Sequence, residues 1–393
     1  MENQLLTIYN KLCSCAVFYR VTEKGIFKAF ENYCLAESAR EKRKAYTAFV
    51  AEIYERGGSL TALVERLVSE DENVYVKAVA AKKTVNENVE SSVWRELAIF
   101  SSFASLQAED FAADMGISVE ELPRFTSVNA DMGASYKNRI ANLHKYGYGI
   151  FSSVCMFRLS DDKKIEPIVS ADKISMAQFI GYEAEREKIV ANTRAFVDGR
   201  PAANALLCGD AGTGKSSTVK AVANAFFNEG VRLIELRKDQ LRYLPLVMGK
   251  ISGNPLKFII FIDDLSFNQN NDDFSMLKAA LEGSASATAD NAVIYATSNR
   301  RHIVKESFGD RDGDDVHRND TMQETLSLSE RFGLTVLFSK PDKKLYLKIV
   351  KELALRAGIA MDEKELEIQA EAFALRKGNR SARCAEQFIN SLL

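Results

Sequence analysis

The feature that most constrains this chain is a glycine-rich segment, GDAGTGKS, which runs from Gly209 to Ser216. Its spacing is that of a phosphate-binding loop, G-x-x-x-x-G-K-[ST], and it directly follows the apolar run from Ala203 to Cys208. Glycines allow such a loop to curl with its backbone N–H groups pointing at a phosphate, and the next helix adds the positive end of its dipole. The sequence therefore predicts a buried strand, a phosphate-binding loop and a helix from about residue 216 to 229.

The side chains of this loop have separate expected roles. Lys215 brings a mobile positive charge to the β- and γ-phosphates of a nucleotide, and the Ser216 hydroxyl is a ligand for Mg²⁺. The alternative is a degenerate loop that no longer binds nucleotide, but all the defining positions are intact. The predicted nucleotide-binding residues of the loop are Gly209, Asp210, Ala211, Gly212, Thr213, Gly214, Lys215, Ser216 and Ser217.

A pair of acids forms the second part of the predicted site. Asp263 and Asp264 follow the apolar run from Phe258 to Ile262, which has the composition of a strand buried on both faces. They would then lie at the carboxyl end of that strand, where open α/β sheets bind ligands. We predict that Asp263 holds Mg²⁺ and that Asp264 orients the attacking water. Acid pairs also occur at strand ends for structural reasons, so this prediction depends on the phosphate loop.

The order of apolar runs predicts the fold class. From Ala203 onward strand-like runs alternate with helical segments, which is typical of an α/β fold with a parallel sheet covered by helices. After Pro341 the chain is again helical. The five predicted strands are Ala203–Cys208, Val231–Leu236, Phe258–Ile262, Ala292–Thr297 and Leu334–Phe338.

The chain is long enough for two or three folding units. Apolar side chains at helical spacing, such as Tyr46, Phe49 and Ile53, predict a helical beginning. Two extended runs, Phe151 to Leu159 and Ile165 to Val169, then predict a hairpin. The predicted domains are a helical N-terminal domain at 1–150, a hairpin-like linker at 151–174, a nucleotide-binding core at 175–340 and a helical lid at 341–393.

Composition excludes several classes of protein. The formal net charge is −2, so bulk charge does not favour non-specific nucleic-acid binding, although a local basic patch could still hold phosphates. The six cysteines do not form the framework of a disulfide-stapled secreted domain. No run of eighteen apolar residues is present, so we expect no membrane partner and a cytoplasmic protein with reduced thiols.

Residues 175–393 resemble the AAA+ superfamily of P-loop ATPases in four further stretches. Phe179-Ile-Gly-Tyr182 is similar to the segment that closes over adenine, which implies nucleotide contacts for Ile180 and Gly181. Ala292-Val-Ile-Tyr-Ala-Thr-Ser-Asn299 resembles the sensor-one strand, which implies that the Asn299 amide lies near the γ-phosphate.

The other two stretches lie in the last third of the chain. Leu328-Ser-Glu-Arg-Phe-Gly333 resembles the arginine-finger segment of bacterial initiators and branch-migration motors, which implies a catalytic Arg331. Gly378-Asn-Arg-Ser-Ala-Arg-Cys-Ala385 resembles the sensor-two helix of the lid, which implies a phosphate-facing Arg383. One departure is Asp264, because many members of the superfamily have glutamate at that position.

The whole chain also resembles an uncharacterised bacterial family of AAA+ ATP-binding proteins catalogued as a domain of unknown function. The resemblance implies a P-loop fold with a parallel five-stranded core, a small helical C-terminal lid and a helical N-terminal domain. It further implies an oligomeric ATPase that uses ATP or ADP with Mg²⁺ and drives core–lid movement on a protein or DNA target. The alternatives are a slow ATP-dependent switch or adaptor, and a protein similar to a DNA helicase loader.

Each transferred residue has a structural alternative. Asn299 could cap the segment after its strand, and Arg331 could pair with Glu330 or another acid within the domain. Ile180 could be an ordinary packing residue, and Arg380 is a rival to Arg383. The acidic stretch from residue 305 to 324 is predicted to be a surface loop, or alternatively a contact with a neighbouring subunit or substrate.

Overall fold

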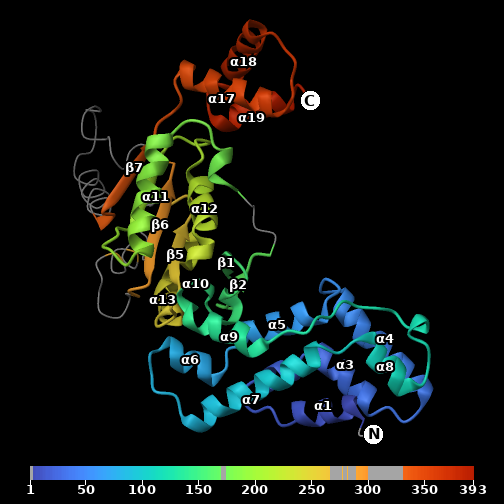
Figure 1. The fold of residues 1–393 in the computed structure, drawn as a ribbon. Coiled ribbons are helices and arrows are strands. Elements are labelled where there is room, and N and C mark those ends of the chain that lie inside the picture. The colour runs from blue at the N-terminus through green and yellow to red at the C-terminus, as the bar shows by residue number, and fades with distance from the viewer. Residues whose placement is uncertain (1–2, 170–173, 266–276, 278–280, 282–288, 300–330) are drawn as a thin grey trace. The chain divides into compact units, whose positions relative to one another are not determined.

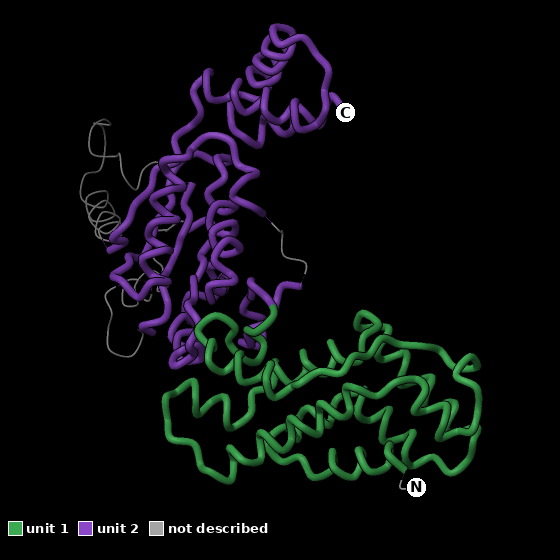
Figure 2. Tube along the Cα trace, in the orientation of Figure 1, with its two compact units in different colours: residues 1–153 green, residues 154–393 purple. Residues whose placement is uncertain are grey.

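The computed structural model describes residues 3–169, 174–265, 277, 281, 289–299 and 331–393. The chain divides into two compact units, unit 1 at Met1–Ser153 and unit 2 at Val154–Leu393 (Figure 2). The acidic stretch at 305–324 and the first half of the predicted finger segment, at 328–330, lie outside the described residues. None of the described helices is long and apolar enough to cross a membrane.

Unit 1 is built from helices, as the apolar spacing predicts (Figure 1). Tyr46, Phe49 and Ile53 lie on one buried face of their helix, and Ser59 caps the next helix by accepting a hydrogen bond from the Ala62 N–H. The elements of unit 1 are α1(Gln4–Leu12), α2(Tyr19–Thr22), α3(Gly25–Cys34), α4(Ala39–Tyr54), α5(Leu60–Glu70), α6(Val74–Ala80), α7(Glu87–Ala104), α8(Ala108–Met115), η1(Val119–Glu121), α9(Met132–Ala141), α10(Leu143–Tyr146) and η2(Gly149–Phe151).

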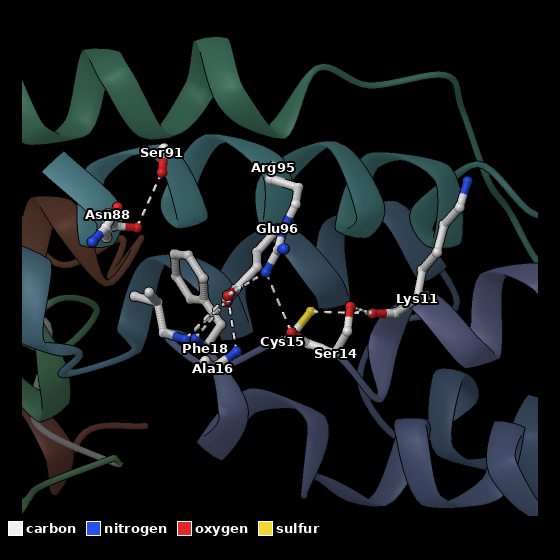
Figure 3. Close-up of polar contacts among 10 residues, drawn as sticks. Lys11, Ser14, Cys15, Ala16, Phe18, Asn88, Ser91, Arg95 and Glu96 are labelled. Carbon is white, nitrogen blue, oxygen red and sulfur yellow. Dashed lines mark hydrogen bonds and ion pairs between the residues drawn. The ribbon is translucent and has the colours of Figure 1, made fainter.

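A buried carboxylate organises the connection between α1 and α2 (Figure 3). Glu96 on α7 is 0% exposed, and its two oxygens accept hydrogen bonds from the backbone N–H groups of Ala16, Val17 and Phe18. Because a buried charge is costly unless it is hydrogen-bonded, this loop and this helix stabilise each other. The guanidinium of Arg95 lies 3.7 Å from Glu96 but is largely exposed.

Unit 2 contains a seven-stranded sheet with the order β2-β1-β4-β5-β6-β3-β7. All neighbouring strands are parallel except β1 and β2. The five predicted strands form within a residue or two of their predicted ends, and two further strands extend the sheet. The strands are β1(Met156–Leu159), β2(Ile165–Pro167), β3(Ala205–Gly209), β4(Val231–Leu236), β5(Lys257–Ile262), β6(Ala292–Ser298) and β7(Leu334–Phe338).

The two additional strands are the predicted hairpin. It forms, but it belongs to the sheet, because β1 pairs in parallel with β4 from Met156 opposite Leu233 onward. Its first strand begins later than predicted, since Gly149–Phe151 form the short helix η2 instead. All five strands predicted for the alternating region form, and the hairpin adds two strands to them, because an apolar run indicates a strand but not its partner.

Helices cover the sheet and form a separate C-terminal bundle. Side chains of α11 and α12, including Ile189 and Val222, pack in one apolar cluster with Leu207 and Ile259 of the sheet. The last three helices share their own core around Tyr346 and Phe388, and they match the predicted lid helices. The helices are η3(Met176–Gln178), α11(Glu183–Val197), α12(Lys215–Ala225), η4(Phe227–Glu229), η5(Lys238–Tyr243), α13(Leu244–Ile251), α17(Lys343–Arg356), α18(Glu363–Lys377) and α19(Ala382–Asn390).

Candidate functional site

The glycine-rich loop connects the fully buried strand β3 to α12 through a backbone that needs glycine. Gly209, Gly212 and Gly214 have φ values of 132°, 75° and 87°, a region that other residues rarely adopt. A Cβ atom on Gly209 would lie 2.1 Å from the carbonyl oxygen of Phe338, so close contact with β7 also requires glycine there. The loop thus has the curled conformation expected from its sequence.

Lys215 begins α12 and turns back over the loop. Its side chain is 5% exposed, and its ammonium donates hydrogen bonds to the carbonyl oxygens of Gly209, at 3.0 Å, and Asp210, at 2.6 Å. Burial lowers the pKa of Lys215 below the usual lysine value, and the Asp210 carboxylate opposes part of that shift. An anion bound beside this ammonium would restore the charged form, because opposite charges favour ionisation.

The two predicted Mg²⁺ ligands lie together. The Ser216 hydroxyl donates a hydrogen bond of 2.6 Å to Oδ1 of Asp263, although 47 residues separate them in the sequence. Thr297 on β6 donates to the same oxygen at 2.5 Å. This meeting follows from the sheet, because β6 lies between β3 and β5 and its residue Ala296 is paired with Ile262. A cluster of hard oxygen ligands at one strand edge results.

Asp264 is held in an uncommon conformation next to this cluster. Its φ is 51°, in the left-handed region, and its N–H donates to Oδ1 of Asp263 at 3.1 Å and to Oγ1 of Thr297 at 2.9 Å. Its own carboxylate accepts a hydrogen bond of 2.8 Å from the Asn299 amide. The Lys238 ammonium lies 3.9 Å from its other oxygen. Backbone strain of this kind is often found at functional sites.

These side chains surround a cleft of about 240 Å³. It lies at the carboxyl end of the parallel strands, where α/β sheets bind ligands. Predicted residues from the phosphate loop, the acid pair, the sensor-one strand and the lid all contribute. The cleft is lined by Ala211, Gly212, Gly214, Lys215, Ser216, Ser217, Asp263, Asp264, Thr297, Asn299 and Arg383.

The structure distinguishes the two candidate lid arginines. Arg383 lines the cleft, and its backbone N–H lies 3.4 Å from the carbonyl oxygen of Gly212. Arg380 instead makes two hydrogen bonds with the Glu371 carboxylate, at 3.0 and 2.9 Å. A Cβ on Gly212 would come within 3.2 Å of Arg383 and within 3.1 Å of Ser381, so the beginning of α19 packs directly against the phosphate loop.

Ile180 and Gly181 are near the loop but do not line the cleft. Ile180 packs against the apolar core of the lid, as expected if it is an ordinary packing residue. Gly181, with φ of 74°, leaves room for Leu345 of α17, and the ring of Phe179 lies 3.7 Å from where a Cβ of Gly214 would be. This segment therefore lies between the phosphate loop and the lid.

Arg331 lies away from the cleft. In the pairing of β3 with β7, Ala205 is opposite Leu334 and Gly209 is opposite Phe338. Arg331 precedes β7, whereas the phosphate loop follows the other end of β3. The paired part of β3 and β7 that separates Arg331 from the phosphate loop is about 13 Å long, at a rise of ~3.3 Å per residue. Arg331 is partly buried and is not one of the residues around the cleft.

Two polar residues of the site were missed by the sequence reasoning. Both are brought to the site by the order of the strands, because Thr297 lies on β6 and Lys238 shortly after β4, and these two strands flank β5. Thr297 lies in the stretch that resembles sensor one, but only Asn299 was selected there. Lys238 begins a short helix after β4, and no local pattern connects it to Asp264.

This combination defines the class of the protein. A phosphate loop between β3 and α12, an acid pair on β5 with β6 between β5 and β3, and a helical C-terminal bundle make unit 2 an α/β P-loop fold of the AAA+ type. The family described as "Protein of unknown function (DUF815)" matches residues 152–393, and the chain belongs to this family. No curated protein sequence matches the chain significantly.

Solved structures with a similar fold include the RuvB Holliday junction branch migration motor of Thermotoga maritima. The identity is 14%, the TM-score is 0.35, and the match covers 56% of this chain and 72% of that one. A single-residue variant of the same motor is 15% identical over the same shares, again with a TM-score of 0.35. Similarity at this level does not identify a function.

Proposed function

We propose that unit 2 binds ATP or ADP with Mg²⁺ in the cleft and hydrolyses ATP. The observation that carries the proposal is the convergence of Lys215, Ser216 and Asp263, with a Ser216–Asp263 hydrogen bond of 2.6 Å. These are a buried cation for phosphate and two oxygen ligands for a divalent ion. Lys215 and Ser216 begin α12, so the positive amino end of that helix dipole also points at the cleft.

The oxygen ligands suit magnesium. Mg²⁺ prefers hard oxygen atoms, keeps several waters and usually binds through one or two protein ligands together with substrate phosphates. Ser216 and Asp263 would hold the ion, which supplies charge neutralisation at the β- and γ-phosphates. Among the residues that the structure describes, no group of three or more His, Cys, Asp or Glu side chains is arranged to hold a metal, in keeping with a site completed by nucleotide.

Asp264 and Asn299 are the proposed positioning groups for the attacking water. The carboxylate of Asp264 would accept a hydrogen bond from water and orient its oxygen toward the γ-phosphorus. As this oxygen bonds to the γ-phosphorus, the bond from phosphorus to the β–γ bridging oxygen breaks, ADP leaves, and the proton of the water passes by way of Asp264 to the released phosphate. Its link to the Asn299 amide supports this role, because the amide can orient the carboxylate and contact phosphate. Arg383 would contact phosphate from the lid.

Nucleotide binding is tested by calorimetry on the Lys215→Ala variant. We expect no measurable binding of ATP, because the variant lacks the buried charge nearest the loop. Lys220→Ala is the matched control, because Lys220 lies on the same helix but pairs with Glu235 at 3.3 Å instead of facing the cleft. Unchanged affinity in Lys215→Ala would refute the assignment of the cleft.

We further propose that the active form is a homo-oligomer in which Arg331 acts on the nucleotide of a neighbouring subunit. The support is its position at the amino end of β7, about 13 Å along the sheet from its own phosphate loop by the ~3.3 Å rise per residue. A guanidinium matches phosphate oxygens with its planar, permanently charged fork. An arginine supplied in this way contributes roughly 10³ to 10⁵ in rate in other phosphoryl-transfer systems.

Complementation tests this arrangement. Arg331→Ala should leave ATP affinity nearly unchanged while lowering hydrolysis by roughly tenfold or more. Mixing it with Lys215→Ala should restore part of the activity, because some interfaces would then pair an intact cleft with an intact arginine. A fully active ATPase that ultracentrifugation shows to be only monomeric would contradict the oligomer and favour a nucleotide-dependent switch.

The proposed target is a macromolecule, on which ATP-driven core–lid movement would act.

A further inference from the structure

We propose that a cationic surface around Tyr243, at the end of η5, binds the phosphate backbone of single-stranded nucleic acid. The surface, called here the cationic patch, consists of Lys163 and Arg242 at the ring of Tyr243, Lys250, which is bound to the carbonyl of Lys163, and the exposed Lys164 next to Lys163 in the turn. It combines the turn of the β1–β2 hairpin with η5 and α13. This inference rests on the proposed function, because it names the class of target on which the ATPase would act.

Two of the four patch cations lie close to one aromatic ring. The Lys163 ammonium lies 5.0 Å from the centroid of the Tyr243 ring, and the Arg242 guanidinium carbon lies 5.1 Å from it. The Lys250 ammonium donates a hydrogen bond of 2.6 Å to the carbonyl oxygen of Lys163. Cations interleaved with an aromatic ring match single-stranded nucleic acid, which offers phosphates and bases that stack.

The patch is built on a fixed framework. Gln240 of η5 is buried and donates a hydrogen bond of 3.0 Å to the carbonyl oxygen of Leu159, at the end of β1. Arg237, just before η5, makes an ion pair of 2.7 Å with Asp161 in the hairpin turn. The turn and η5 are therefore held together by contacts that do not involve the four cations of the patch.

The conformation of Lys163 also points to a functional surface. Its φ is 60°, in the left-handed region, where glycine or asparagine would be the less strained choice for a turn. A lysine there is strained, because its Cβ lies too close to the following carbonyl oxygen. In this conformation the Lys163 ammonium lies over the ring of Tyr243, and the Lys163 carbonyl accepts a hydrogen bond from Lys250. The strained backbone therefore places a cation on the surface in addition to closing the turn.

The local charge balance favours an anion. Within the described part of the chain, no carboxylate lies within an ion-pair distance of the four patch cations. Of the acids in the turn and in η5, Asp161 and Asp239 are both paired with Arg237, and the charge of Arg242 also helps to lower the pKa of Asp239. Asp162 is the third acid of these two segments. A net charge of −2 for the whole chain conceals this excess, and local positive charge is what determines phosphate binding.

The patch is connected to the cleft through one short helix. Tyr243 is the last residue of η5 and Lys238 is the first, and the Lys238 ammonium lies 3.9 Å from the Asp264 carboxylate. A polyanion bound at Tyr243 would add negative charge on the helix that carries Lys238, and would weaken the attraction of Lys238 for the proposed water-orienting group. Nucleic acid bound at the patch should therefore change the rate of ATP turnover.

Fluorescence anisotropy with a labelled oligothymidylate, in the absence of nucleotide, tests the binding itself. We expect wild-type protein to bind with an affinity that falls steeply as salt rises, and the Lys163→Glu/Arg242→Glu double variant to bind roughly tenfold more weakly or worse. Lys188→Glu/Lys364→Glu is the matched control, because both are exposed lysines on α11 and α18, away from the patch. It should bind like wild type.

Three results would overturn the inference. The first is that wild-type protein does not bind the oligonucleotide, and the second is that the patch variant binds it like wild type. The third is that polyglutamate displaces the oligonucleotide at equal charge concentration, which would indicate an acidic protein segment as the partner. Calorimetry of the patch variant with ATP should give wild-type affinity, which shows that it is folded. Failure of nucleotide binding in wild-type protein would instead refute the proposed function, so the two failures are distinguishable.

Discussion

Replacing Glu96 by glutamine should destabilise unit 1 and leave the nucleotide site unchanged. The substitution keeps the shape of the side chain but exchanges one acceptor oxygen for an NH₂ group that cannot accept a hydrogen bond. The Glu96 carboxylate accepts four hydrogen bonds of 2.8 to 3.2 Å from three consecutive backbone N–H groups. The amide group of glutamine must turn its NH₂ toward at least one of these donors.

The size of the effect follows from those contacts. Two of the four hydrogen bonds are lost, and bonds to a charged group contribute about 1.5–3 kcal/mol each, so the expected loss is about 3–6 kcal/mol. That is a large part of the ~5–15 kcal/mol that holds a typical domain folded. Arg95 offers a comparison, because its guanidinium is 59% exposed and 3.7 Å from Glu96, and Arg95→Ala should cost about 1 kcal/mol or less.

Hydrogen exchange is the suitable assay, because a chain with two units need not unfold in one step. The amides of Ala16, Val17 and Phe18 should exchange much faster in Glu96→Gln, and ATP affinity measured at low temperature should equal that of wild type. Glu90→Gln, an exposed residue of the same helix, is the control. Unchanged exchange at the three amides would refute the reasoning, and loss of ATP binding would show that the units do not fold independently.

Two further predictions concern the cleft. Asp264→Asn should keep ATP bound but stop its hydrolysis, because Asp263 and Ser216 remain as Mg²⁺ ligands, and turnover at the wild-type rate would give Asp264 another role. Because burial lowers the pKa of Lys215, a bound phosphate should raise that pKa again, so nucleotide binding should take up protons and weaken as the pH rises through the lowered value. Calorimetry in buffers with different ionisation enthalpies measures this uptake, and its absence would mean that Lys215 is fully charged in the free protein.

The sequence predicts well those parts of the site that local pattern determines. The phosphate loop needs only a strand, a helix and glycines at set positions, and Gly209, Gly212 and Gly214 all have the positive φ that this requires. The end of the strand before Asp263 can be predicted equally well from local sequence, because an apolar run of β-type residues ends there. These features do not depend on which strand is the neighbour of which.

What depends on pairing between distant strands could not be predicted in the same way. Thr297 reaches Asp263 because β6 is inserted between β3 and β5, and one apolar strand is much like another in sequence. The hairpin at 156–167 was recognised by its turn, but its attachment to β4 is a contact across about 75 residues of chain that no local periodicity records. The choice between Arg380 and Arg383 likewise needed Glu371, which holds Arg380.

The hairpin also determines where the sheet ends. β2 has three residues, and its last, Pro167, has no N–H group to offer another strand. Without β1 and β2, the nearly fully buried strand β4 would become the edge, with a row of unpaired N–H and C=O groups that a second molecule could pair with. A recombinant fragment that begins at residue 154 keeps the proline-terminated edge, whereas one that begins at residue 175 exposes an apolar template and should aggregate.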